Sequence, residues 1–256
     1  MSTKLKIAAA VAAAVLLSAC SSPKHEPMPL VNFTPSMEVT EVWSKGLSSA
    51  EGFLVPAVYD DMVFAAGGKT LTRLNARTGE TEWSVSFDSP ITGGVGSDGY
   101  VTAVGLWDGN LEVVDAEGKV SWEKKLTTEL ASPPVVSHGL VIARTMDTRV
   151  SAFEASSGEL QWTYQKSQPA LTVRLPTRML AHDNFLLVGQ PNGHIVILDI
   201  ASGKSVFEFQ VAQAKGVTEV ERLVDVVGAP AFSENLVCAA AFQGAVTLSL
   251  IHISEP

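Results

Sequence analysis

The 256-residue chain is poor in basic residues, in cysteine and in charge of either sign. It has 18 lysines and arginines against 27 acids and a formal net charge of −9, whereas a nucleic-acid binder needs basic surface to neutralise phosphates. Its two cysteines, Cys20 and Cys238, are too few for a disulfide framework. Because 46% of the residues are hydrophobic and only 18% are charged, disorder along the whole length is not expected. What remains is an acidic, folded protein of one large or two modest domains.

Patterns of catalytic or metal-binding residues are also missing. The five histidines are scattered, and no pair has the spacing of metal ligands. There is no nucleophile elbow, and the glycine-rich segment 93–96 is followed by neither lysine nor helix, so it is interpreted as a bend in a strand. The sequence therefore predicts no catalytic residue, no metal and no cofactor, in a protein that is not an enzyme.

The first nineteen residues are typical of a secretory signal peptide. Lys4 and Lys6 precede an apolar run from Ile7 to Leu17. This run is shorter than the roughly 20 residues that a membrane-spanning helix needs, and it has the length of the apolar core of a signal peptide. We expect residues 1–19 to be removed from the mature protein.

Cys20 ends a short motif of small residues, Leu17-Ser18-Ala19-Cys20. This motif resembles the bacterial lipobox, which implies that Cys20 becomes the acylated first residue, held firmly by several acyl chains. The alternative is a plain signal peptide with a chance cysteine. Ser21, and not an aspartate, follows, and by resemblance to lipoprotein sorting rules this favours the outer membrane. Residues 20–38, rich in serine and proline, are then a flexible tether.

A unit of about forty residues repeats through residues 39–247. Segments 71–83, 111–122, 150–162 and 195–207 align, and each carries a glycine turn followed by an aromatic residue. The aromatic residues are Trp43, Trp83, Trp122, Trp162 and Phe207, separated by 40, 39, 40 and 45 residues. A period of this length indicates a solenoid or a propeller.

The content of each unit favours the propeller. Short apolar runs such as 56–59 and 62–66 alternate with turn residues and read as strands. Four strands in forty residues make one propeller blade, whereas helical repeats would need longer stretches with a 3.6-residue period. We predict an all-β protein, a β-propeller of four-stranded blades. In such a fold one large ring on each outer strand can pack between neighbouring blades, so the five aromatic residues are predicted to have this structural, blade-docking role.

The repeat resembles that of quinoprotein (PQQ) dehydrogenases, most closely in Asn75-Ala-Arg-Thr-Gly79-Glu-Thr-Glu-Trp83. Combined with the lipobox, residues 1 to 247 resemble the BamB family, lipoproteins of the outer-membrane β-barrel assembly (BAM) complex. That resemblance implies a non-enzymatic scaffold anchored in the outer membrane, on its periplasmic face. It also implies contact with a periplasmic POTRA domain of BamA, and with other BAM components and unfolded outer-membrane proteins as possible further partners.

Two alternatives to the scaffold come from the same fold. One is a quinoprotein-type, PQQ-dependent dehydrogenase or a fragment of one, although the adjacent cysteines and acidic calcium site of those enzymes are missing from this sequence. The other is a ligand-binding propeller with a site at its central channel.

The resemblance also implies eight blades, of which the sequence accounts for about four, with the start of a fifth at residues 227–247. Residues 248–256 break the repeat and look like translated sequencing-adapter read-through. We interpret this tail as a possible artefact of a truncated gene model. The rival interpretation is a genuine short array that is open or completed by another chain.

Two long connections between blades, 162–176 and 207–230, are where partner-binding residues are expected. They leave adjacent blades at equivalent points and should emerge on one face. Both resemble the BamB loops that dock on BamA, which implies partner-contact roles for Leu171, Val173, Arg174 and Asp225. The family has a second acid where Val227 stands. The alternative is that Leu171 and Val173 fold back onto the blade while Arg174 pairs with Asp225. The spacing of apolar residues after Val217 allows a short helix.

Overall fold

The computed structural model describes residues 29–32, 34, 36–48, 54–173, 175, 177–233, 236–244 and 246–250. The predicted signal peptide, Cys20 and much of the predicted tether lie outside the described residues. No helix in the described part is long and apolar enough to span a membrane. The chain divides into two units, Met1–Glu41 and Val42–Pro256. In the first unit the described residues form neither helix nor strand.

The second unit is built from nineteen strands in five antiparallel sheets, within the described residues. Four sheets have four strands each and the last has three, always in sequence order. The first sheet contains β1 (Ala57–Tyr59), β2 (Met62–Gly67), β3 (Thr70–Asn75) and β4 (Thr81–Ser86). The second contains β5 (Ile91–Ser97), β6 (Thr102–Leu106), β7 (Asn110–Val114) and β8 (Val120–Lys125). The predicted fold class, a β-propeller of four-stranded blades, is confirmed.

The remaining three sheets continue the same pattern. The third contains β9 (Val135–Ser137), β10 (Leu140–Arg144), β11 (Val150–Glu154) and β12 (Leu160–Tyr164). The fourth contains β13 (Leu180–His182), β14 (Phe185–Gly189), β15 (His194–Asp199) and β16 (Ser205–Gln210). The fifth contains β17 (Val226–Ser233), β18 (Leu236–Ala241) and β19 (Val246–Leu250). Strand β19 thus includes three residues of the segment 248–256 that breaks the sequence repeat.

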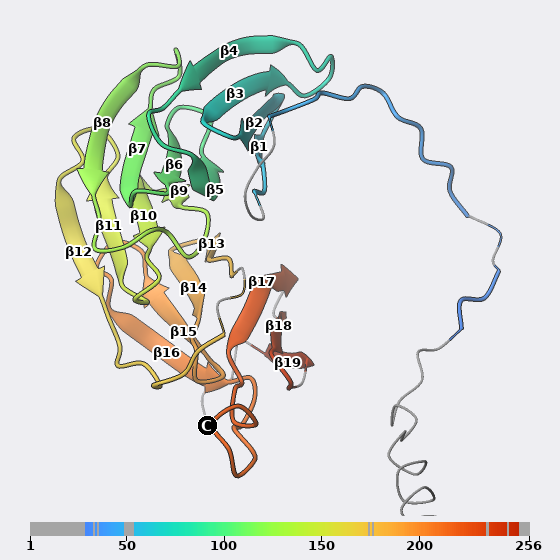
Figure 1. Ribbon diagram of the computed structural model, residues 1–256, viewed down its shortest axis with the longest axis vertical. Helices are drawn as coiled ribbons and strands as arrows, with labels where there is room; N and C mark the ends of the chain where they lie inside the picture. The colour runs from blue at the N-terminus through green and yellow to red at the C-terminus, as the bar shows by residue number, and fades with distance from the viewer. Residues whose placement is uncertain are drawn as a thin grey trace, which may run out of the picture. The chain divides into compact units, whose positions relative to one another are not determined.

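The sheets follow one another as blades along an arc, with the first strand of each on the inside and the fourth on the outside (Figure 1). Middle strands are apolar on both faces because a neighbouring sheet covers each face; Ile195 to Leu198 in β15 are all buried. Outer strands alternate instead, since only one of their faces is covered, as in β4.

The hydrophobic core is divided among the seams between consecutive sheets. One cluster joins the first and second sheets, with Phe64 and Leu71 facing Ile91 and Val104. Further clusters join the second sheet to the third, the third to the fourth, and the fourth to the fifth. Because each blade buries its apolar faces only against its neighbours, the array is stabilised seam by seam, as in other repeat proteins.

The segment before the first sheet matches the repeat in sequence alone. Residues 39–45 align with the fourth-strand segments of the repeat, but the described residues 36–48 form no strand. A fourth strand needs a third strand beside it for its backbone hydrogen bonds, and none of the strands in the described residues pairs with this segment. Trp43 nevertheless docks on the first sheet.

Candidate partner-binding surface

The seams of the propeller share one hydrogen bond. Each predicted docking tryptophan donates its indole Nε1 hydrogen to a backbone carbonyl oxygen of the next sheet: Trp43 to Ala76 at 2.9 Å, Trp83 to Ala116 at 3.0 Å, Trp122 to Ala155 at 2.8 Å and Trp162 to Ile200 at 2.8 Å. The acceptor lies in the turn between the third and fourth strands of that sheet. The ring therefore buries its apolar body and also satisfies its one polar atom.

Two features of that turn require glycine. Gly203 has a φ of +68°, in the left-handed region that side chains disfavour. A Cβ on Gly203 would also lie 2.5 Å from the Trp162 ring. Gly79, Gly118 and Gly158 have the same positive φ and the same close approach to the preceding tryptophan. The glycine and the tryptophan of successive repeats thus form one interlocking contact.

Phe207 takes the tryptophan position on β16 but lies differently. Its side chain is 42% exposed, and its ring centroid is 6.2 Å from that of Phe209. The equivalent receiving turn would follow β19, at positions outside the described residues. Its predicted docking role stays a prediction.

The two long connections meet on one side of the third, fourth and fifth sheets. The first, residues 165–179, joins β12 to β13; the second, residues 211–225, joins β16 to β17. The Asp225 carboxylate Oδ2 accepts a hydrogen bond from the Val173 backbone N–H at 2.6 Å. Near the end of the first connection, the Arg178 N–H donates to the Gly228 carbonyl oxygen at 3.0 Å. The fold therefore joins two loops that lie about fifty residues apart in sequence.

Apolar side chains are exposed on both connections. Leu171 and Leu175 of the first loop are each 41% exposed, and Val217 of the second is 96% exposed. Val220 is exposed too, and Val173 is half-buried. Arg174, which is also a predicted contact residue, lies outside the described residues. We call the exposed part of these two connections the loop surface.

The second loop is shaped by a single turn, and the short helix that its spacing allowed does not form. The Arg222 N–H donates to the Thr218 carbonyl oxygen at 3.2 Å, and no further helical turn follows in the described residues. Glu221 Oε2 accepts from the N–H groups of Val217 and Thr218 at 2.9 and 3.0 Å, while Thr218 Oγ1 accepts from the Glu221 N–H. These hydrogen bonds hold the pKa of Glu221 below its usual value. This reciprocal capping box defines the turn from which Val220 projects.

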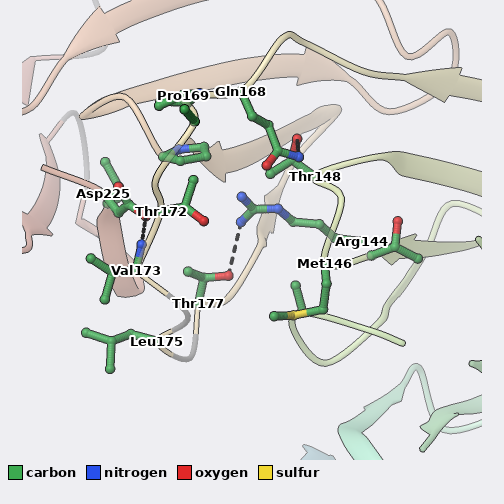
Figure 2. A pocket seen from close by; sticks show the side chains of 15 residues that line it. Arg144, Met146, Thr148, Gln168, Pro169, Thr172, Val173, Leu175, Thr177 and Asp225 are labelled. Atoms are coloured by element: carbon green, nitrogen blue, oxygen red, sulfur yellow. Dashed lines mark hydrogen bonds between the residues drawn. The ribbon is translucent and has the colours of Figure 1, made fainter. Parts of the chain in front are cut away.

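Behind the loop surface is a cavity of about 260 Å³, lined by both loops and by the β10–β11 and β14–β15 turns (Figure 2). Two charged groups line it, Arg144 at the end of β10 and Asp225 at the start of β17, and each is only 4% exposed. Arg144 Nη1 donates to Thr177 Oγ1 at 3.0 Å. Burial lowers the pKa of Arg144 to about 10, and the Asp225 charge partly offsets this shift.

Asp225 therefore lies inside the loop structure and does not face solvent. Burial raises the pKa of its carboxyl group, against the effects of the Val173 hydrogen bond and of Arg144. Among the described residues, its electrostatic partner is Arg144. Arg144 ends an apolar strand about twenty residues before the first loop, and nothing local in the sequence marks it as part of this surface. Trp107, 61% exposed in the β6–β7 turn, was also not singled out as a candidate contact.

A family model described as "Outer membrane protein assembly factor BamB" matches residues 67–255. The chain belongs to the BamB family. A BamB of Burkholderia pseudomallei is 38% identical over 92% of this chain and 64% of its own length. A BamB of Bordetella pertussis is 34% identical over 90% and 61%, respectively. The chain thus spans a little under two thirds of the length of these relatives.

Solved structures agree on the fold. The crystal structure of BamB from Moraxella catarrhalis superposes with a TM-score of 0.70 at 27% identity, over 77% of this chain and 61% of the other. A quinohemoprotein alcohol dehydrogenase of Pseudomonas putida superposes with a TM-score of 0.55 at 16% identity, which shows a shared fold alone. The BamB relatives are named as assembly factors and not as enzymes. In the described part of the chain, no cluster of three or more His, Cys, Asp or Glu could hold a metal ion.

Proposed function

We propose that this protein is a non-enzymatic scaffold lipoprotein of the outer-membrane β-barrel assembly machinery, and that its loop surface binds a periplasmic POTRA domain of BamA. Its role would be to orient BamA, and incoming unfolded outer-membrane proteins, without bond chemistry. Cys20 would carry the lipid anchor that holds it on the periplasmic face of the outer membrane. Membership of the BamB family supports the assembly role.

The observation that carries the proposal is that the Val173–Asp225 hydrogen bond joins two loops from different blades, and that both loops expose apolar side chains. Leu171 and Leu175 stand on one loop and Val217 and Val220 on the other, all exposed. Apolar anchors grouped on a surface and flanked by charge are typical of protein–protein contacts. The loops emerge from rigid sheets, which keep them in place for docking.

Within this surface the four predicted residues take different parts. Leu171 is an anchor that enters the partner, and Arg174 contributes a positive charge to the contact. Val173 is half-buried and contributes its backbone, which the Asp225 carboxylate holds at 2.6 Å. Asp225 is buried, so it acts by positioning the first loop.

A Leu171→Asp variant tests the proposal. We expect its affinity for the purified periplasmic domain of BamA to fall at least tenfold, because loss of a central apolar anchor costs about 2 kcal/mol. Its thermal unfolding midpoint should stay unchanged, since Leu171 is already partly exposed. Calorimetric titration measures the first and circular dichroism the second.

The matched control is Val120→Asp, on the outer strand β8, where the side chain is similarly exposed. This variant should bind BamA like the original chain. Unchanged affinity of Leu171→Asp, or equal loss in both variants, would contradict the placement of the binding site on the loop surface.

A further inference from the structure

Arg144 holds the end of the first loop without belonging to that loop. Its Nη1 donates to Thr177 Oγ1 at 3.0 Å, close to where the first loop rejoins β13. Figure 2 shows its guanidinium group reaching into the cavity among Thr177, Thr148 and Gln168. Its opposite charge, Asp225, holds the same loop at the Val173 N–H. The loop is thus attached at positions 173 and 177, with Leu175 exposed between them.

Other bonds of the described residues hold the start of the first loop. At its start, Lys166 pairs with Glu208 at 2.6 Å and Gln168 Nε2 donates to Thr148 Oγ1 at 2.8 Å. Beyond Gln168, two hydrogen bonds to charged side chains hold the described residues, Val173 to Asp225 and Thr177 to Arg144. A backbone bridge between Thr177 and Gly228 ties the end of the loop to β17.

We propose that Arg144 is the positioning residue of the first loop, holding Thr177 directly, and Val173 through the charge of Asp225, in the positions that binding to BamA requires. The inference rests on the proposed function of this surface, but it concerns a residue that makes no contact with the partner. Arg144 acts from the β10 strand of the third sheet, so the blade itself sets the shape of the loop.

Arg144 can position the loop because it and Asp225 are opposite charges buried around the same cavity. The structure shows no direct hydrogen bond between Arg144 and Asp225; each binds the loop and attracts the other across the cavity. Among the described residues that line this cavity, these two are the charged ones. Removal of one buried charge leaves the other uncompensated, which is strongly unfavourable. The loop would then change its shape to bring Asp225 to water, and its apolar residues would move from their docking positions.

The test compares two variants of this protein, Arg144→Met and Arg149→Met. Amide hydrogen exchange and the affinity for the periplasmic domain of BamA are measured for each. Arg149 follows the same turn but pairs with Asp147, and it makes no hydrogen bond to the described residues of the loop. For Arg144→Met we expect faster hydrogen exchange at the Val173 amide and roughly tenfold weaker binding, because affinity falls with the fraction of molecules whose loop is competent. Arg149→Met should change neither.

A second substitution that restores binding would distinguish a role of Arg144 in positioning the loop from a general loss of stability. In Arg144→Met/Asp225→Asn no buried charge is left unpaired, and the asparagine oxygen can still accept from the Val173 N–H. We expect this double variant to recover part of the lost affinity and of the Val173 protection. A variant that is merely less stable would lose more with a second substitution. If Arg144→Met does not fold, Thr177→Val removes the same loop bond alone, and should show a smaller effect of the same sign.

Normal Val173 exchange together with normal affinity in Arg144→Met would overturn the inference, even where Leu171→Asp abolishes binding. If neither Leu171→Asp nor Arg144→Met alters binding to BamA, the proposed function fails. The amide exchange of Val173 would still decide whether Arg144 holds the loop.

Discussion

The seams of this propeller and its loop surface are built on opposite principles. At the seams the same contact recurs: a tryptophan ring on a glycine turn, with one indole hydrogen bond, from Trp43 on Ala76 to Trp162 on Ile200. The loop surface occurs once, where the connections lengthen, and a pair of buried opposite charges supports it. Repetition in this chain therefore carries stability, and departure from the repeat marks the surface proposed to bind.

The two regions also differ in how they tolerate change. A seam buries large rings against backbone, so there is no room for an added atom beside Gly203. The loop surface keeps its apolar side chains exposed, so substitution there should alter binding and leave folding intact.

The largest effect is expected from Trp162→Ala, in the seam between the third and fourth sheets. Trp162 is buried and its Nε1 donates to Ile200, so truncation should lower the free energy of unfolding by about 3–5 kcal/mol. Urea denaturation measures it. The control is Trp107→Ala, at an exposed ring, where the change should stay within about 0.5 kcal/mol. Similar losses in both would show that the seams are not the source of stability.

A smaller effect is expected from Gly203→Ala, and a matched glycine separates its two causes. Gly139 has a φ of +71° like the +68° of Gly203, but a Cβ there would meet nothing within 4 Å. Gly139→Ala should therefore cost about 1 kcal/mol for the left-handed backbone alone. Gly203→Ala adds the clash with Trp162 and should cost about 3 kcal/mol. Equal costs in urea denaturation would remove the clash as a reason for this glycine.

The smallest effect, opposite in sign, is expected at a cross-strand pair of the second sheet that departs from the equivalent pairs of its neighbours. In β7, Glu112 lies opposite Glu123, where the first and third sheets have hydroxyl pairs, Thr72 with Ser84 and Ser151 with Thr163. Burial, and then the charge of Glu123, raise the pKa of Glu112 from 4.5 to about 7. The folded state thus holds this proton more tightly than the unfolded state, and stability falls as pH rises through that interval.

Glu112→Gln should remove this loss of stability at high pH, because glutamine does not titrate. We expect it to raise the free energy of unfolding by about 1–2 kcal/mol at about pH 8 and to have no effect near pH 4.5. Urea denaturation at the two pH values measures the difference. Glu117→Gln, at an exposed turn position, is the control and should change nothing. A gain from Glu112→Gln that is equal at both pH values would contradict a titrating origin.

Sequence reasoning identified the blades because their signal is local and repeated. Each turn glycine and each tryptophan stand at a fixed distance in the chain, and the strands between them have a two-residue period. Segment 39–45 shows the limit of this reasoning. It matches the fourth-strand pattern but forms no strand, because pairing depends on a neighbour and not on the segment's own residues.

The candidate site was predicted only in part. The two connections between blades were predicted to bind a partner because they are long. They were predicted to lie on one face because they leave adjacent blades at equivalent points. The sequence did not reveal that Asp225 turns inward to bind Val173, nor that Arg144, from another sheet, supplies the opposite charge in the same cavity. The helix that the spacing after Val217 allowed is a single turn, closed by the side chain of Glu221.

By itself, then, the sequence determined the all-β class, the blade repeat and the residues that interlock the blades. All of these follow from periodicity and from the conformational freedom of glycine, which act over a few neighbouring residues. The tertiary structure alone decided which side chains meet behind the loop surface. Burial of Arg144 and Asp225 around one cavity depends on three sheets being in place, and charges that attract across such a distance in the chain leave no local pattern in the sequence.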